Sequence, residues 1–296
     1  MLWILFSILA ALIWAVVNII DKYVLSKLIS KPIIPLIIMG FIGLFASLLV
    51  FIFLDFQRLS VNNILLALIS GFLYVLAAFF YFHAVKIEEI SKVVPLFYLT
   101  PVFILFIVGI FLGEIFTPIK YFGIILLILG AILISTNKLF LISFSRAFWF
   151  MILASLLLAV DQIITKYLLG FADFWTIFAY IRVGAFIALV PAIAVNGDNF
   201  KTLYKKKGLW PFILMSLNEA FNLLAVLFIT VATAIGFVTL VNALSSVRSF
   251  FVLLFTVLIS FFYPQILKEK IGKSIILVKL SAIAMMFFGA ILVSFG

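Results

Sequence analysis

Ten apolar runs divide the chain, and each is close to the length that an α-helix needs to cross a lipid bilayer. Such a helix needs about 20 predominantly apolar residues. A backbone in lipid must satisfy its own hydrogen bonds, which leaves helices or closed barrels, and a barrel would show shorter alternating segments. We therefore expect an all-α integral membrane protein with ten transmembrane helices. The approximate runs are 2–25, 33–54, 63–84, 93–113, 119–135, 147–169, 174–195, 210–231, 236–262 and 275–294.

The composition is that of a chain whose main solvent is lipid. Of its 296 residues, 68% are hydrophobic and 10% are charged, whereas a soluble domain carries roughly 25% charged residues. The longest joint between runs, from Asn196 to Lys207, is too short for a soluble domain and is expected to be a solvated basic loop. The first residues, MLWILFSILA, lack a basic segment and a cleavage site, so they predict a retained first helix. We expect a multi-pass protein of the cell membrane, plasma or inner.

Charge and residue usage exclude several classes of function. The net charge is +10, and lysines in short joints are expected to orient the chain, because no basic helix or aromatic–basic platform for nucleic acid is present. The chain has no cysteine and a single histidine, His83, so it can form neither a disulfide nor a thiolate or multi-histidine metal site. Motifs of metalloproteases, serine hydrolases and P-loop proteins are absent. We expect no enzyme activity, cofactor, metal or nucleic-acid partner.

Two segments of the first half recur in the same order in the second half. Residues 7–25, SILAALIWAVVNIIDKYVL, align with residues 151–169, MILASLLLAVDQIITKYLL, at an offset of 144. Residues 121–135, YFGIILLILGAILIS, align with residues 280–294, LSAIAMMFFGAILVS, at an offset of 159. The matches involve the first and the last run of each half, which indicates a duplication.

The duplication predicts residues 1–138 as the first five-helix repeat and residues 139–296 as the second. Because five is odd, the second copy enters the bilayer from the opposite side, and the repeats are inverted. Inverted repeats recur in secondary transporters, with a binding site between the halves near the midplane.

On these features the chain resembles the drug/metabolite transporter superfamily, and within it the EamA-type members with ten helices. The segments that carry the resemblance are YFHAVKIEEISKVVPLFYLTPVF, with a polar joint before a proline-bearing helix, and GIFLGEIFTPIKYFGIILLILGAILI, with a Gly-Glu turn before a glycine-containing helix. The counterpart turn in the second half, QILKEKIGKS, lacks the Gly-Glu pair. The resemblance implies ten helices around a central cavity and the export or exchange of amino acids or similar metabolites.

Charged side chains at membrane depth are the candidate site. A charge at the bilayer centre costs roughly 2.5–3.5 kcal/mol on insertion scales, so such residues are usually functional. Asp161, Glu219 and Arg248 lie near the middle of their expected spans, whereas Arg182 lies about a third of the way along and is expected to reach toward an interface. In the alternative interpretation, Arg248 pairs with Glu219 or Asp161 and locks the two halves together.

A cavity lined by these helices suits a small polar or zwitterionic solute, with a carboxylate on Arg248 and an ammonium on Glu219 or Asp161. Either carboxylate could instead carry a coupling proton.

In the first half, Trp14 and Asn18 are one turn apart and offer an aromatic face and an amide; the alternative is a belt tryptophan and a helix–helix hydrogen bond. The residues expected to contact substrate are Trp14, Asn18, Tyr98, Asp161, Gln162, Asn218, Glu219, Asn222, Asn242 and Arg248.

Two features of the helices concern movement and packing. Pro95 and Pro101 are expected to kink the fourth helix and to act as hinges, although proline kinks also occur in purely structural helices. Gly123 and Gly130 in the fifth run match Ala282 and Gly289 in the tenth, and this spacing predicts a close-packed seam between the two helices.

The distribution of lysine and arginine predicts the orientation. Joints that follow odd-numbered spans hold 14 of these residues, and the other joints hold 3, which are Arg58, Lys120 and Lys166. The positive-inside rule then places the first set in the cytoplasm and both termini outside, whereas the family resemblance implies termini inside.

The function expected from the sequence is alternating-access transport of a small polar or zwitterionic metabolite, as an exporter or exchanger. The alternatives are a transporter of amphipathic or cationic drugs and a membrane scaffold or receptor without transport. The expected partners are a small-molecule substrate, the lipid bilayer and a coupling proton, and the sequence requires nothing larger than a monomer.

Overall fold

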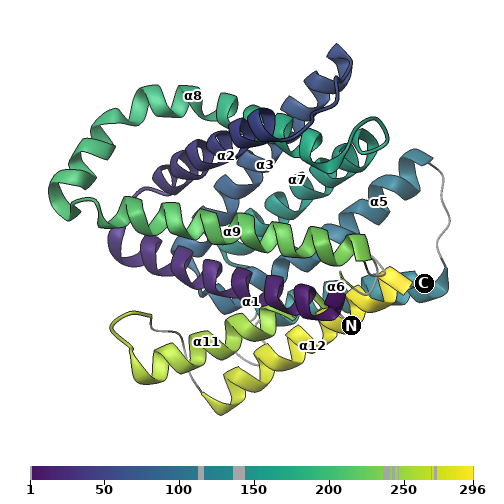
Figure 1. Cartoon of the computed structure of the whole chain (residues 1–296). Coiled ribbons are helices and arrows are strands. Elements are labelled where there is room, and N and C mark those ends of the chain that lie inside the picture. Colours follow the sequence, from purple (N-terminus) through teal and green to yellow (C-terminus); the bar gives the residue numbers. More distant parts are fainter. Residues whose placement is uncertain are drawn as a thin grey trace.

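The computed structural model describes residues 2–112, 117–135, 144–235, 241, 244–245, 247–267, 269 and 272–295. Its regular elements in these residues are all helices, and they pack side by side in one bundle (Figure 1). The predicted boundary between residues 138 and 139 lies outside the described residues. In the first half, the elements are α1 (Leu2–Tyr23), a π-helical turn η1 (Val24–Leu28), α2 (Ile33–Phe53), α3 (Val61–Ile87), α4 (Ile90–Val93), a 3-10 helix η2 (Val94–Leu99), α5 (Thr100–Leu112) and α6 (Pro118–Ser135). In the second half they are α7 (Arg146–Leu168), α8 (Phe174–Lys207), α9 (Trp210–Ile235), α11 (Arg248–Phe262) and α12 (Lys273–Phe295).

The helices account for the predicted spans in order. Within the described residues, eight helices are long and apolar enough to cross a membrane, and Pro118–Ile134 and Arg248–Phe262 are shorter apolar helices at the fifth and ninth expected spans. Large apolar side chains such as Phe53 and Phe261 stand on the outer surface, 75% and 72% exposed, as expected where lipid is the neighbour. The prediction of an all-α membrane protein is confirmed.

Three helices begin where a short polar side chain caps the first turn. The Ser60 hydroxyl accepts a backbone hydrogen bond at the start of α3, and Ser145 does the same for α7. The Asp173 carboxylate accepts from the backbone N–H groups of Trp175 and Thr176, at 2.8 and 3.0 Å, at the start of α8. These caps satisfy N–H groups that have no partner inside the helix, so the sequence fixes these three starts.

The fourth span is not one continuous helix. It begins at Ile90, earlier than predicted, and passes through the 3-10 segment η2 before α5. Pro95 lies in the first turn of η2 and Pro101 in the first turn of α5, and each removes a backbone donor. The Ser155 hydroxyl of α7 donates to the Leu96 carbonyl at 3.1 Å, so a neighbouring helix satisfies part of the interrupted backbone.

The prediction of a basic loop from Asn196 to Lys207 is wrong, because α8 continues as a helix to Lys207. One face of this extension is anchored: Leu203 is 8% exposed and joins an apolar cluster with Val24 and Met215. The lysines occupy the other positions and are compatible with a helix, since lysine is a good helix former. The helix ends at Gly208, whose φ of +67° suits glycine.

The two halves pack helix against helix across the bundle. The main pairs are α6 with α12, α3 with α7, α1 with α9, α2 with α8 and α3 with α8. In the first pair, a Cβ on Gly123 would lie 2.8 Å from the Gly289 carbonyl oxygen, and one on Gly130 would lie 3.0 Å from the Ala282 carbonyl oxygen. The predicted close-packed seam is therefore confirmed. Its contacts are reciprocal: Gly123 faces Gly289, which aligns with Gly130 in the sequence, and Gly130 faces Ala282, which aligns with Gly123.

Candidate functional site

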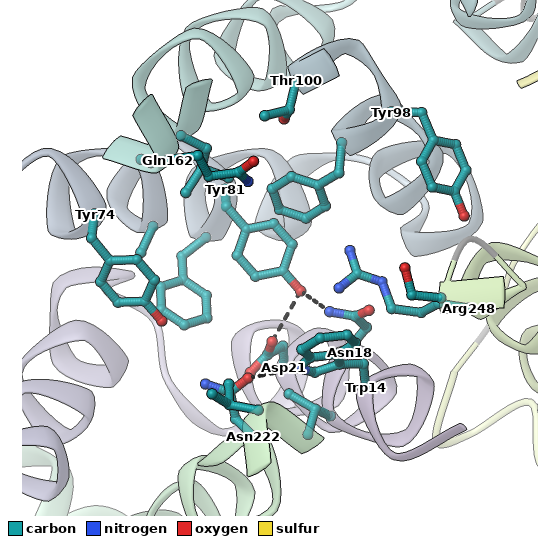
Figure 2. Close-up of a pocket in the computed structure, with 18 of the residues that line it drawn as sticks. Trp14, Asn18, Asp21, Tyr74, Tyr81, Tyr98, Thr100, Gln162, Asn222 and Arg248 are labelled. Carbon is teal, nitrogen blue, oxygen red and sulfur yellow. Dashed lines mark hydrogen bonds between the residues drawn. The ribbon is translucent and has the colours of Figure 1, made fainter. Parts of the chain in front are cut away.

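A cavity of about 610 Å³ lies between the two halves. Its volume is within the range of small-molecule sites, roughly 300–1,000 Å³. Polar groups and aromatic rings line it together, and Figure 2 shows them converging from several helices. Its polar and aromatic lining includes Trp14, Asn18, Asp21, Tyr74, Tyr81, Phe97, Tyr98, Thr100, Gln162, Arg182, Asn218, Glu219, Asn222, Ser245 and Arg248.

Most of the predicted contact residues reach this cavity. Asp161 does not line it: the Ser70 hydroxyl of α3 donates a hydrogen bond to the Asp161 carboxylate at the α3–α7 contact. Asn242 lies outside the described residues. Of the two proposed hinges, Pro101 lines the cavity and Pro95 is buried away from it. The predicted residues that do line the cavity are Trp14, Asn18, Tyr98, Gln162, Asn218, Glu219, Asn222 and Arg248.

Asp21 also lines the cavity, although it was not among the residues predicted to contact substrate. Its side chain is held on one side by the Tyr81 hydroxyl, which donates at 2.9 Å, and on the other by the Asn218 amide, which donates at 2.7 Å. The Asn18 amide donates to the Tyr81 oxygen at 2.7 Å and completes a chain of neutral donors (Figure 2). The spacing of Trp14, Asn18 and Asp21 places all three on one face of α1, and this pattern could have identified Asp21.

Hydrogen-bond acceptors outnumber donors around Asp21. The Oδ1 atoms of Asn18 and Asn218 are buried and have no hydrogen-bond partner in the described part of the structure. No lysine or arginine nitrogen among the described residues lies within 4.0 Å of the Asp21 carboxylate. Buried acceptors without donors are costly, so this corner of the cavity favours a group that brings several N–H donors.

Glu219 already has a cation beside it. The Arg182 Nη1 and Glu219 Oε1 atoms are 3.9 Å apart, and both side chains are more than nine-tenths buried. The Arg182 guanidinium also lies over the Tyr74 ring, 4.7 Å from its centroid, and over the Phe178 ring at 5.1 Å. The expectation that Arg182 reaches toward a membrane interface is therefore wrong. Its side chain lies inside the bundle and is the counterion of Glu219.

A hydrogen-bonded chain connects this ion pair to α1. The Asn222 amide nitrogen lies 3.2 Å from each Glu219 carboxylate oxygen. The Asn222 oxygen accepts a hydrogen bond from the Trp14 indole N–H at 3.0 Å. The indole is thereby fixed in position beside the cavity, so Trp14 is not a membrane-belt tryptophan. Its bond to α9 and the Asn18 bond to Tyr81 of α3 are helix–helix hydrogen bonds, as the alternative interpretation predicted, and both residues also line the cavity.

Arg248 has aromatic neighbours instead of a counterion. Its guanidinium carbon lies 5.1 Å from the Phe97 ring centroid and 5.7 Å from the Trp14 ring centroid. No described carboxylate lies within 4.0 Å of its nitrogens. The alternative in which Arg248 locks the halves by pairing with Glu219 or Asp161 is not observed. Its donors face a cavity that it shares with Asp21, and Figure 2 shows both side chains near the Tyr81 hydroxyl.

Among the described residues, no group of three or more His, Asp or Glu side chains is placed to hold a metal ion. The cavity instead combines one arginine without a counterion, one carboxylate held by neutral donors, and a neutralised Arg182–Glu219 pair. Chemically, this arrangement can bind opposite charges on one small molecule.

Comparison with known proteins finds a family match for part of the chain and a shared fold. Residues 1–136 match the EamA-like transporter family. No curated protein matches the chain. Among solved structures, 26 chains match. One is a crystal structure of a protein that is 14% identical in sequence, with a TM-score of 0.54 over 97% of this chain and 94% of the other. At that identity the likeness concerns the fold alone.

Proposed function

We propose that this chain, whose residues 1–136 match the EamA-like transporter family, is a secondary transporter that exports or exchanges a small zwitterionic metabolite such as an amino acid. The solute would bind in the central cavity with its carboxylate on Arg248 and its ammonium beside Asp21. One observation carries this proposal: the cavity presents a cation, Arg248, and an anion, Asp21, and among the described residues neither has an oppositely charged group within 4.0 Å.

The carboxylate end of the solute is assigned by the donor geometry of arginine. A guanidinium donates two parallel hydrogen bonds to a carboxylate, and charge-assisted bonds are roughly twice as strong as neutral ones. The Phe97 and Trp14 rings lie beside this guanidinium, and no described carboxylate lies within 4.0 Å of its N–H groups. A low-polarity surrounding strengthens such an interaction.

The ammonium end differs from our expectation from the sequence. Glu219 is already neutralised by Arg182, and Asp161 is bonded to Ser70 away from the cavity. Asp21 accepts only from neutral groups and has unpartnered amide oxygens beside it on Asn18 and Asn218. An ammonium group brings three N–H donors, which matches this excess of acceptors.

Alternating access between two inverted repeats would provide the movement. The pairing of helices supports this part of the proposal: α1 packs on α9 as α7 packs on α3, and α2 and α6 each pack on their own counterparts, α8 and α12. The reciprocal glycine contacts between α6 and α12 have the form expected of a two-fold axis. A cavity at the interface of inverted repeats is the usual place for a transported solute.

Flux through purified protein in liposomes tests the proposal directly. We expect labelled amino acids to move across the membrane, and Arg248→Gln to lower the flux at least about tenfold because a charge-assisted contact is lost. Arg58→Gln, in the exposed joint after α2, is the matched control and should leave the flux unchanged. An unaltered flux in the Arg248 variant, or no amino-acid flux in the unmodified protein, would contradict the assignment.

Proton coupling is a separate part of the proposal. Glu219 is its main candidate, since it faces the cavity and contacts Arg182 and Asn222, and Asp161 is the second. Glu219→Gln is expected to abolish any acceleration of flux by a pH gradient and to retain exchange of solute against solute. If the variant responds to the gradient as the unmodified protein does, Glu219 carries no coupling proton.

The aromatic lining gives a specific reason to test a second candidate, the transport of amphipathic cations. Besides the Tyr74 and Phe97 rings, which already contact arginines, Tyr81, Phe82 and Tyr98 line the cavity, and aromatic rings attract cations. A cationic substrate would be repelled by Arg248, so Arg248→Gln should increase its flux, whereas the same change should decrease the flux of a zwitterion. Opposite signs therefore separate the two candidates, and a scaffold without transport would move neither solute.

A further inference from the structure

A buried ionic cluster joins the two halves of the chain outside the cavity. The Lys279 ammonium on α12 lies 2.8 Å from the Glu89 carboxylate, 3.1 Å from the Glu269 carboxylate and 2.8 Å from the Ser91 hydroxyl. The Ser91 backbone N–H donates to Glu269 at 3.2 Å, and its hydroxyl also donates to Glu269. We call Glu89, Ser91, Glu269 and Lys279 the latch.

The latch lies at the lysine-rich end of the bundle, beside the end of α3, where further contacts involve the residues after α1 and the extension of α8. Lys31, after α1, donates to Asn199 in the extension of α8 at 2.9 Å, and Lys86, near the end of α3, donates to the Ser30 carbonyl. Along α3, the cavity residue Phe82 is six residues from Glu88, which corresponds to about 9 Å of helix. The latch therefore lies a short distance beyond the cavity at this end of the bundle.

Each member of the latch is withdrawn from solvent. Ser91, Glu269 and Lys279 are 0%, 7% and 3% exposed, and the Glu89 side chain is 14% exposed. The Glu269 backbone N–H donates to the Ser260 hydroxyl of α11 at 3.0 Å, which holds Glu269 against that helix. Glu89 and Ser91 belong to the first half and Glu269 and Lys279 to the second, so closure of this end depends on contacts between the halves.

Ionic contacts and the glycine seam differ in how they can open. The α6–α12 seam joins backbone to backbone without room for a side chain, so separating it exposes packed surface for no compensating interaction. Carboxylates and an ammonium regain hydration when a buried pair is separated, and this offsets much of the lost attraction. The ionic contacts of the latch can therefore exchange between a closed and an open arrangement.

From this geometry we propose that the latch is the gate at the lysine-rich end, and that the Lys279 contacts with Glu89 and Glu269 must break for the cavity to open there. This inference rests on the proposed transport function. At the offset of 159 between the repeats, Lys279 corresponds to Lys120 at the start of α6, toward the opposite end of the bundle. Breaking the latch is thus expected to affect access from one side only.

Cysteine accessibility tests the gate, and the absence of native cysteine keeps the background low. A single Ala78→Cys in the cavity lining is the reporter, and a separate Lys206→Cys at the end of α8 identifies the lysine-rich side. An impermeant thiol reagent is applied to vesicles of known sidedness. Lys279→Met is expected to raise labelling of the cavity cysteine from the lysine-rich side by about tenfold or more, because the loss of one partner of a buried pair strongly destabilises the closed arrangement.

Two variants control for misfolding and for nonspecific loss of charge. Lys273→Met removes an exposed lysine from the same helix and should leave labelling unchanged. Glu269→Gln keeps the size of the side chain and should raise labelling in the same direction as Lys279→Met. If labelling is unchanged in both Lys279→Met and Glu269→Gln, and both proteins are monodisperse, the gate proposal is overturned.

A crosslink provides the converse measurement. In the Ser91→Cys, Glu269→Cys variant, a short thiol–thiol crosslinker should stop liposome flux, while binding of the amino acid in detergent persists. Continued flux at full crosslinking would overturn the gate. If no amino-acid flux is found but Lys279→Met still opens the cavity to the reagent, the proposed function is wrong and the gate proposal stands. If flux depends on Arg248 but labelling is the same with and without the latch contacts, the gate proposal is wrong and the proposed function stands.

Discussion

The Trp14 indole donates a 3.0 Å hydrogen bond to the Asn222 side chain, which joins the first helix to α9 across the centre of the protein. Through Asn222 the indole is connected to Glu219 and then to Arg182, and its ring forms one wall beside the Arg248 guanidinium. The neutralised ion pair thus contributes to the site by positioning the side chains around the free arginine.

Removing this hydrogen bond should weaken solute binding. Trp14→Phe keeps an aromatic face for Arg248 and deletes the N–H donor. A hydrogen bond contributes about 1 kcal/mol net, so the dissociation constant measured by calorimetry should rise about fivefold.

Trp149→Phe is the control for the Trp14 variant, since this tryptophan is 56% exposed on α7. The control should bind solute as the unmodified protein does. Equal dissociation constants for both variants would show that the indole N–H does not organise the site.

The Arg182–Glu219 pair should be strongly coupled in stability. Arg182→Gln leaves a buried carboxylate without its cation, and such changes cost about 3–5 kcal/mol. The double variant with Glu219→Gln removes both charges and should recover a large part of that loss, as measured by thermal unfolding in detergent. Lys201→Gln is the control, because the Lys201–Asp198 pair is 3.8 Å apart with side chains 79% and 97% exposed, and surface pairs contribute little. Additive effects in the double variant would argue against a coupled pair.

The sequence predicted the spans well because lipid requires long apolar runs, and those runs are visible without any tertiary information. It failed at the end of α8, where Lys205 to Lys207 were assigned to a loop. Lysines at the end of a run show that a segment leaves the hydrocarbon, but not that the helix stops. Packing of Leu203 in an apolar cluster that includes Val24 and Met215 decides that, and such contacts between distant segments leave no local pattern.

Site residues were predicted less evenly, because depth in the membrane does not reveal which way a side chain faces. Asp161 and Glu219 are equally central in their spans, yet only Glu219 lines the cavity. Asp21 escaped notice because it stands beside Lys22 near the end of the first span, where a charge needs no explanation. Its role depends on Tyr81 and Asn218, which come from two other helices.

The α6–α12 seam should tolerate no side chain. In Gly289→Ala the added Cβ would lie 2.9 Å from the Gly123 carbonyl oxygen and 3.0 Å from Leu127, and overpacking typically costs about 1–3 kcal/mol. We expect a lower unfolding temperature and, if the seam is the fixed contact between the repeats, lower flux. Gly197→Ala is the matched control in α8, where nothing lies within 4 Å, and it should stabilise the helix by about 0.5–1 kcal/mol. Equal stability of the two variants would contradict the close backbone contact at Gly289.

The orientation of the chain can be decided with one added cysteine. Lys206 is exposed in the last turn of α8, at the lysine-rich end, and the positive-inside rule places that end in the cytoplasm. In intact cells a cysteine replacing Lys206 should therefore resist an impermeant thiol reagent and react only after permeabilisation. A cysteine replacing Arg58, in the exposed joint after α2, should react without permeabilisation. The reverse pattern would place both termini inside and the latch on the outer face, so that breaking the Lys279 contacts would open the cavity outward.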